Sequence, residues 1–474
     1  MQKLTRRQML STTAKGLGLL ALAALPAACG ATPAPTATAV KQAAAAPAPA
    51  PTPAPKTPTT ISFITPGAVG LERTMYDNFV NKFMVENPDI KVNVSYEAWA
   101  DYMTKLPVIL AGGVIPDALH QHMSIVQDYA QKGALLDLKP LMDRDSIKQA
   151  DYIEALFDAF SNKGKVYGIP KDSAGWGVYY NKAMFDAAKI AYPKDNWTVD
   201  DFFSLAQQLT LDTSGNPAGS AKFDASKIKQ WGYVWDQQPT PTDSESRRPF
   251  FTAMSADWYA DDYKSTRIAE PAAVALLKKF ADMRCVTHSA PMTTEAQGMG
   301  DVFRAGLAAM IVGFHTVDFF SRQELVKFPY DVTYTPSGPG GQFSVVGCSG
   351  WCVEANAKYK EEGWRLVKFL VSLPTQTYIG QQGRWGVALK GAVDTIIPAD
   401  KKPAGFAKVH CDPFKGVGPT KSITFKFPPQ QSKIKEYYAA EFDPIWQCSK
   451  SDVATAAANV KKLVDPLLTG MNWF

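Results

Sequence analysis

The sequence lacks the short motifs that most directly mark an enzyme. It contains no H-E-x-x-H zinc-binding pair, no G-x-S-x-G nucleophile elbow, no phosphate-binding P-loop and no G-x-G-x-x-G following a strand. The segment Gly347-Cys348-Ser349-Gly350 is one residue short of a nucleophile elbow. A membrane-anchored hydrolase stays open as an alternative, because Asp172 and Asp236 are candidates for the paired acids of a glycosidase.

The sequence also lacks a strong excess of charge. Its formal net charge is +5, and the only four charged residues before Cys29 are all basic, which leaves +1 once that start is removed. A nearly neutral body offers no electrostatic basis for binding nucleic acid. We therefore expect no nucleic-acid partner.

Cysteines are few, and those after Cys29 are odd in number: Cys285, Cys348, Cys352, Cys411 and Cys448. At least one of these five is unpaired within the chain. Cys411 with Cys448 is one candidate bridge, although the sequence does not choose among the pairings. The spacing of Cys348 and Cys352 is not that of a zinc ribbon, so we expect neither a metal nor a cofactor.

The first 28 residues have the layout of a targeting segment, with a basic start and an apolar run, Leu17–Leu25, too short to span a bilayer as a permanent helix. Thr5–Leu10 resembles a twin-arginine export signal, which implies export of the folded protein. Leu25–Cys29 resembles a bacterial lipobox, although Pro26 stands where leucine is usual. We expect a lipid on Cys29, with plain cleavage and secretion as the alternative.

Residues 29–58 after the signal are mostly Ala, Pro and Thr, with two lysines and no acidic residue. Such a composition cannot build a core. As polyproline II at about 3.1 Å per residue it would reach roughly 90 Å. We expect a tether between the lipidated Cys29 and a globular body.

The body from Thr59 onward alternates strand and helix patterns. Ile61–Ile64 and Ile90–Tyr96 are strand-like, and between them apolar residues recur every four positions from Met75 to Phe83, as on one helix face. A short buried strand is expected at Ile115–Leu119. This order predicts parallel α/β packing, and 474 residues predict two or three domains.

A loop is expected at His120–Ser124, after the strand ending at Leu119. Ligands bind outside the carboxyl ends of such strands, so Gln121 and His122 are candidate hydrogen-bonding residues. The His-x-His pair has no nearby carboxylate or cysteine, and a metal site is therefore not expected.

The segment Gly164–Lys182 is predicted to cross between two bodies. It is strand-like up to Ile169, is interrupted by Pro170, and resumes as a strand after small residues that surround Trp176. Trp176 is either a ligand platform at this crossing or an ordinary core residue.

Several segments, in chain order, carry a family likeness: Ala111–Asp117, Gly133–Leu138, Gly164–Lys182, Trp197–Phe202 and Phe303–Ile311. Together they resemble the extracellular solute-binding proteins of ABC importers, in the maltose-binding-protein-like branch (family 1) that mostly takes sugars. The resemblance implies an α/β, two-lobed periplasmic-binding-protein-like fold, in which each lobe is a mostly parallel sheet flanked by helices. A hinge joins the lobes, and the ligand cleft lies between them.

The resemblance further implies a monomer that is not an enzyme, that lies outside the cytoplasm and that passes its ligand to an ABC permease. The ligand is expected to be a carbohydrate, with a polyol, a glycerol phosphate or a peptide as alternatives. The expected division is 1–28 signal, 29–58 tether, 59–172 with 313–356 as the first lobe, and 173–312 with 357–474 as the second.

A sugar offers C–H faces to aromatic rings and hydroxyls to directed hydrogen bonds, so its site should combine aromatic and polar residues. The candidates are Trp176, Trp385, Trp235, Phe314, His315, Trp351, Gln121, His122, Asp172, Asp236 and Arg384. His315 stands where the family frequently has tryptophan.

Overall fold

The computed structural model describes residues 57–67, 70–234, 246–292, 295, 302–314, 326–383, 385–396, 403–424 and 426–470. The chain divides into two units, Met1–Pro55 and Lys56–Phe474. The predicted signal and Cys29, most of the tether, and four candidate site residues (Trp235, Asp236, His315 and Arg384) lie outside the described residues, as does the side chain of Phe314. No helix in the described ranges is long and apolar enough to cross a membrane.

A first sheet has five strands in the order β2-β1-β3-β13-β6. Their bounds are β1 Thr59–Pro66, β2 Ile90–Glu97, β3 Ala118–His122, β6 Ile169–Pro170 and β13 Ser349–Cys352. Strands β1, β2 and β3 are parallel, whereas β13 runs antiparallel to both of its neighbours. Helix α1 (Gly70–Glu86) buries Met75, Phe79 and Phe83. The predicted strand, helix and strand at the start of the body are confirmed.

The expected loop at His120–Ser124 is wrong. Strand β3 continues to His122, and α3 (Met123–Gln131) begins at the next residue. Successive side chains of a strand point to opposite faces of the sheet, so His120 and His122 share one face and Gln121 occupies the other.

A second sheet has seven strands in the order β14-β12-β7-β10-β9-β8, with β11 also paired to β7. Their bounds are β7 Ala174–Asn181, β8 Leu211–Asp212, β9 Ile228–Val234, β10 Ala308–Phe314, β11 Tyr330–Thr333, β12 Phe343–Gly347 and β14 Lys421–Ile423. The pairs β9–β10 and β12–β14 are parallel, and β7 is antiparallel to each of its partners.

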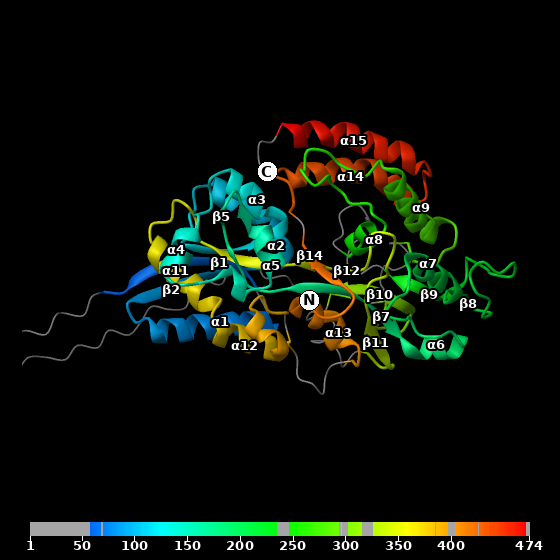
Figure 1. Cartoon of the computed structure of the whole chain (residues 1–474), viewed down its shortest axis with the longest axis horizontal. Coiled ribbons are helices and arrows are strands. Elements are labelled where there is room, and N and C mark those ends of the chain that lie inside the picture. The colour runs from blue at the N-terminus through cyan, green and yellow to red at the C-terminus, as the bar shows by residue number, and fades with distance from the viewer. Residues whose placement is uncertain are drawn as a thin grey trace, which may run out of the picture. The chain divides into compact units, whose positions relative to one another are not determined.

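The remaining elements are α2 Trp99–Ala111, α4 Lys139–Arg144, η1 Gln149–Asp151, α5 Glu154–Phe160, β4 Ser161–Asn162, β5 Lys165–Val166, α6 Lys182–Ala188, α7 Val199–Gln208, α8 Arg248–Ala253, α9 Pro271–Cys285, α11 Lys360–Leu370, α12 Leu373–Gln382, η4 Lys390–Thr395, α13 Phe406–His410, η6 Asp412–Lys415, α14 Gln431–Trp446 and α15 Val453–Thr469. Figure 1 shows β1, β2 and β3 of the first sheet in blue to cyan and β8 and β9 of the second in green, whereas β13 of the first sheet and β12 of the second come from the yellow part of the chain. Helices α14 and α15 pack side by side and both contact α9.

The expected lobe boundaries differ from the observed sheets. Strands β11 and β12 lie on the second sheet, although 313–356 was assigned to the first lobe. Helix α11, assigned to the second lobe, packs on the first sheet and on α1. The chain therefore leaves the second sheet at Gly347, later than predicted, and does not return at residue 357.

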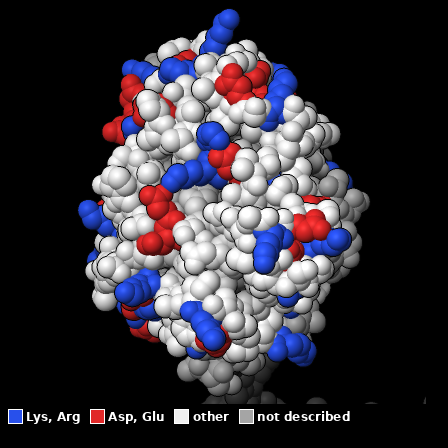
Figure 2. All heavy atoms as spheres, turned by 90° about the vertical axis from the view of Figure 1, so that its right-hand side faces the viewer, with Lys and Arg blue, Asp and Glu red and all other residues white. Residues whose placement is uncertain are grey.

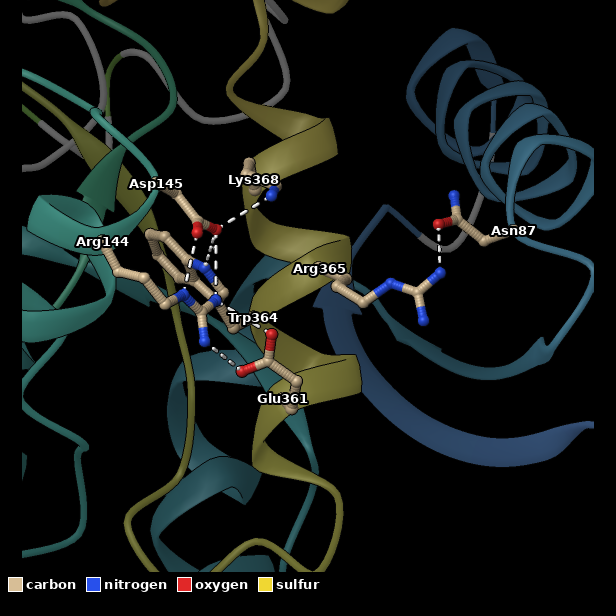
Figure 3. A network of polar contacts seen from close by, with 7 residues as sticks. All are labelled: Asn87, Arg144, Asp145, Glu361, Trp364, Arg365 and Lys368. Carbon is tan, nitrogen blue, oxygen red and sulfur yellow. Dashed lines mark hydrogen bonds and ion pairs between the residues drawn. The ribbon is translucent and has the colours of Figure 1, made fainter.

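A polar network fixes α11 on the first sheet's helices (Figure 3). Asp145, which follows α4, accepts hydrogen bonds from the Trp364 indole and the Lys368 ammonium of α11, each at 2.8 Å. On the other side of α11 (Figure 3), Arg365 pairs with Asp89, which follows α1, at 2.6 Å. Hydrogen bonds from Arg144 and Lys368 hold the pKa of the Asp145 carboxyl well below its usual value.

A disulfide joins Cys285 at the end of α9 to Cys448 just after α14. Cys348, Cys352 and Cys411 are buried. The candidate bridge between Cys411 and Cys448 is therefore wrong. The bridge ties two helices that already pack together.

Acidic and basic side chains are interspersed on the face that carries the right-hand side of Figure 1 (Figure 2). That face has no extended field of one sign. It gives no electrostatic basis for attracting a polyanion.

Candidate functional site

Two crossing segments connect the sheets and lie against each other. The chain passes from β6 to β7 through residues 171–173, and from β12 to β13 through Cys348 alone. The Lys171 amide donates to the Ser349 carbonyl at 2.9 Å, and Ala174 pairs with Gly347. The carboxyl end of β3 is adjacent, since His122 pairs with Ser349. Residues from both sheets therefore meet here.

A buried ion pair occupies the first crossing. The Lys171 ammonium lies 2.6 Å from one Asp172 carboxylate oxygen, and the other oxygen accepts a hydrogen bond from the Ser349 amide at 2.6 Å. The Lys171 side chain is only 3% exposed. Asp172 thus links the two crossing segments, and this structural role accounts for both of its oxygens.

Aromatic rings surround the Lys171 ammonium. It lies 4.0 Å from the ring centre of Trp385 and 5.4 Å from that of Trp351. Tyr76 of α1 contacts both tryptophans, with ring centres 5.6 Å apart in each case. Trp385 is half-buried, whereas Trp351 is buried in the first-sheet core. A ligand can therefore reach Trp385 more readily than Trp351 in this conformation.

Trp176 lies in β7 at a position paired with Phe314 of β10. Its side chain is 5% exposed and belongs to the hydrophobic core. Only a small part of the indole is open to a ligand in this conformation. This burial agrees with the alternative that Trp176 is an ordinary core residue. Its role as a platform stays a prediction.

Gln121 and His122, predicted together, lie on opposite faces of the first sheet. Gln121 is fully buried, and neither its amide nitrogen nor its amide oxygen has a hydrogen-bond partner in the described part of the chain. His122 is half-buried and accepts a hydrogen bond from the Ser124 amide at 3.3 Å. Because the two side chains lie on opposite faces of the first sheet, Gln121 is separated from the aromatic residues around His122.

Both histidines of β3 are held neutral. Burial lowers the pKa of His122 to about 3, and the positive charges of Lys435 and Lys171 add to the effect. Burial likewise holds the pKa of His120 well below its ordinary value. Each ring therefore offers one donor and one acceptor nitrogen at neutral pH.

Four residues near this cluster were missed by sequence reasoning: Tyr76, Trp99, His120 and Lys171. Trp99 begins α2 two residues beyond β2, and its ring is edge-on to His120 and His122. An aromatic residue three positions after the alternating strand Ile90–Tyr96 was the signal that could have identified it. Lys171 directly follows the strand-interrupting Pro170, although nothing in the sequence shows that its ammonium is buried.

Within the described residues, no group of three or more His, Cys, Asp or Glu side chains could hold a metal ion. The arrangement instead offers aromatic faces, neutral imidazoles and one internally paired lysine. These groups suit non-covalent binding of an uncharged polar molecule better than bond breaking.

Residues 78–405 match the family described as bacterial extracellular solute-binding protein. The erythritol/L-threitol-binding protein of Mycolicibacterium smegmatis is 32% identical over 323 residues, which cover 61% of this chain and 62% of that protein.

Two solved structures share the fold. An ABC substrate-binding protein of Listeria monocytogenes in complex with cycloalternan is 24% identical, with a TM-score of 0.72 and coverage of 87% of this chain and 99% of that one. UgpB of Mycobacterium tuberculosis in complex with glycerophosphocholine is 18% identical, with a TM-score of 0.69 and coverage of 87% and 98%.

Proposed function

The chain belongs to the bacterial extracellular solute-binding protein family of ABC importers, and we propose that it captures a sugar between its two lobes and delivers it to a permease. The observation that carries the proposal is the cluster of Lys171, Trp385, Tyr76 and the β3 histidines beside the two crossing segments. It combines aromatic faces and neutral hydrogen-bonding groups, which sugar rings require.

Within this proposal, Trp385 is the principal aromatic contact from the first lobe. Trp176, Trp351, His122 and Gln121 contribute as the lobes move. Of the remaining candidates, Trp235, Asp236, Phe314 and His315 supply contacts from the second lobe, and Arg384 supplies one from the first. Asp172 acts by holding the crossing rather than by touching the ligand.

The first lobe comprises residues 57–172 and 348–396, and the second comprises 173–347 and 403–470. We propose a third crossing between η4 and α13. Rotation about these crossings closes the lobes. A ligand that contacts both lobes in the closed form, and one lobe in the open form, shifts the population toward closure.

The protein acts as a monomer outside the cytoplasm, and it releases its ligand chemically unchanged. The twin-arginine-like segment directs export, and a lipid on Cys29 holds the body near the membrane through residues 29–58. These features rest on the sequence alone.

Calorimetric titration with maltose, raffinose, tagatose and erythritol tests the proposal. Saturable binding of a sugar, weakened about tenfold by Trp385→Ala and much less by Trp385→Phe, is the expected result, because stacking needs a flat ring.

Two other outcomes would change the assignment. Binding of erythritol alone would favour a polyol, the alternative supported by the 32% identical relative. Turnover of a chromogenic glycoside would replace the binding function with a hydrolase.

A further inference from the structure

Trp99 is unusual among the described tryptophans because it is 48% exposed. The other large hydrophobic side chains exposed in the described ranges are aliphatic. An indole face open to water forgoes the stabilisation that its burial would give. Core packing therefore does not account for an exposed tryptophan at this position.

The position of Trp99 is that of a ligand-contacting residue. It lies beyond the carboxyl end of β2, and its ring contacts two residues at the carboxyl end of β3. In the order β2-β1-β3-β13-β6 the edge at β1 and β3 is a topological switch point, because the connection from β1 leads to β2 on one side, whereas the chain after β3 returns to the sheet at β6 on the other side. Ligands of open α/β sheets bind outside such an edge.

The Trp99 ring is exposed but oriented. His120 and His122 meet it at interplanar angles of 85° and 84°, with ring centres 5.8 and 5.4 Å away. His122 is itself fixed by hydrogen bonds to Ser124. A supported ring loses little conformational freedom when a ligand stacks on it.

Two buried ring nitrogens without a hydrogen-bond partner in the described residues lie near the Trp99 ring. The Nδ1 atom of His120 and the Nε1 atom of Trp351 are buried and form no hydrogen bond within the described part of the chain. The two rings are 5.8 Å apart. Buried polar atoms normally have a hydrogen-bond partner. The two nitrogens therefore favour a polar ligand near the Trp99 ring.

We propose that Trp99 is a stacking and specificity-determining residue for a sugar or polyol, with the β3 histidines as its support. This proposal rests on the proposed function and names a residue of the same site. A saturated carbon face covers the indole, while hydroxyl groups take hydrogen bonds from neighbouring groups. A ligand without a C–H face gains nothing from the ring.

The test compares Trp99→Ala, Trp99→Leu and Trp99→Phe in calorimetric titrations of the full chain with maltose, raffinose, tagatose and erythritol. Val108→Ala is the matched control, because Val108 is an exposed apolar residue of the same helix. We expect about a tenfold weaker Kd for Trp99→Ala and Trp99→Leu, and near wild-type binding for Trp99→Phe and Val108→Ala. Thermal melts supply a readout that separates stability from affinity.

The possible results are distinct. If the wild type binds a probe and both Trp99→Ala and Trp99→Leu bind it equally well, the inference is overturned while the proposed function stands. Lower melting temperature with unchanged Kd gives Trp99 a structural role and also overturns it. If the wild type binds none of the four probes, the sugar-binding function fails, and the inference fails with it.

Discussion

Replacing Asp172 should destabilise the crossing between the sheets. At 2.6 Å the attraction between Lys171 and Asp172 is about 6 kcal/mol at an effective dielectric constant of about 20. Desolvation offsets part of this, and removing one partner of a buried pair typically costs about 3–5 kcal/mol. The Trp385 ring still stabilises the remaining ammonium, by about 1 kcal/mol. We expect Asp172→Asn to lower the free energy of unfolding by about 3 kcal/mol.

Urea unfolding monitored by circular dichroism measures this loss. Lys171→Met and the double variant Lys171→Met/Asp172→Asn complete a thermodynamic cycle, and the double variant should lose less than the sum of the single changes by about 2 kcal/mol. Lys105→Met is the control, because the ion pairs of Lys105 are exposed. A single-variant loss below about 0.5 kcal/mol, or strict additivity in the cycle, would refute the reasoning.

Three further outcomes are expected. Cys285→Ser should cost about 3 kcal/mol of stability in urea unfolding, and dithiothreitol should have no further effect on that variant; an unchanged midpoint would contradict a structural role for the bridge. Asp145→Asn should cost about 2 kcal/mol at pH 7. Because the folded-state pKa of Asp145 is lowered, that difference from the wild type is present above pH 4 and should shrink as pH falls below it, and a constant difference would count against the network. Ligand affinity should be constant between pH 5.5 and 7.5, since His122, with a pKa of about 3, stays neutral throughout; a tenfold change between calorimetric titrations at these two values would show otherwise.

Local patterns predicted the start of the body well. The alternation in Ile90–Tyr96 and the four-residue spacing from Met75 to Phe83 are direct consequences of one buried face, and both elements formed as expected. Thr198 and Asp201 form a capping box at the start of α7, a local arrangement that their three-residue spacing allows.

Predictions that depended on tertiary packing failed. His120 and His122 are polar, yet they extend β3 because tryptophan and tyrosine rings cover them. The second crossing is one residue long, at Cys348, which no linker composition marks. Cys285 and Cys448 are 163 residues apart and are brought together only by the packing of α9 against α14.

The sequence predicted a site of aromatic and polar residues, and the binding role of each candidate stays a prediction. Trp385 lies in the cluster, whereas Asp172 has a structural role and Trp176 is largely buried. Burial of Lys171 between two tryptophans depends on how α1 and the segment at Trp385 pack, which no single stretch of sequence encodes.

A crystal structure of the protein with the best-binding sugar tests the central claim most directly. The account predicts a sugar ring against Trp385 and Trp99, enclosed by residues of both lobes, with the segments 171–173 and 347–349 adjusting as the hinge. A sugar bound away from these residues, or held by one lobe with the lobes unmoved, would contradict it.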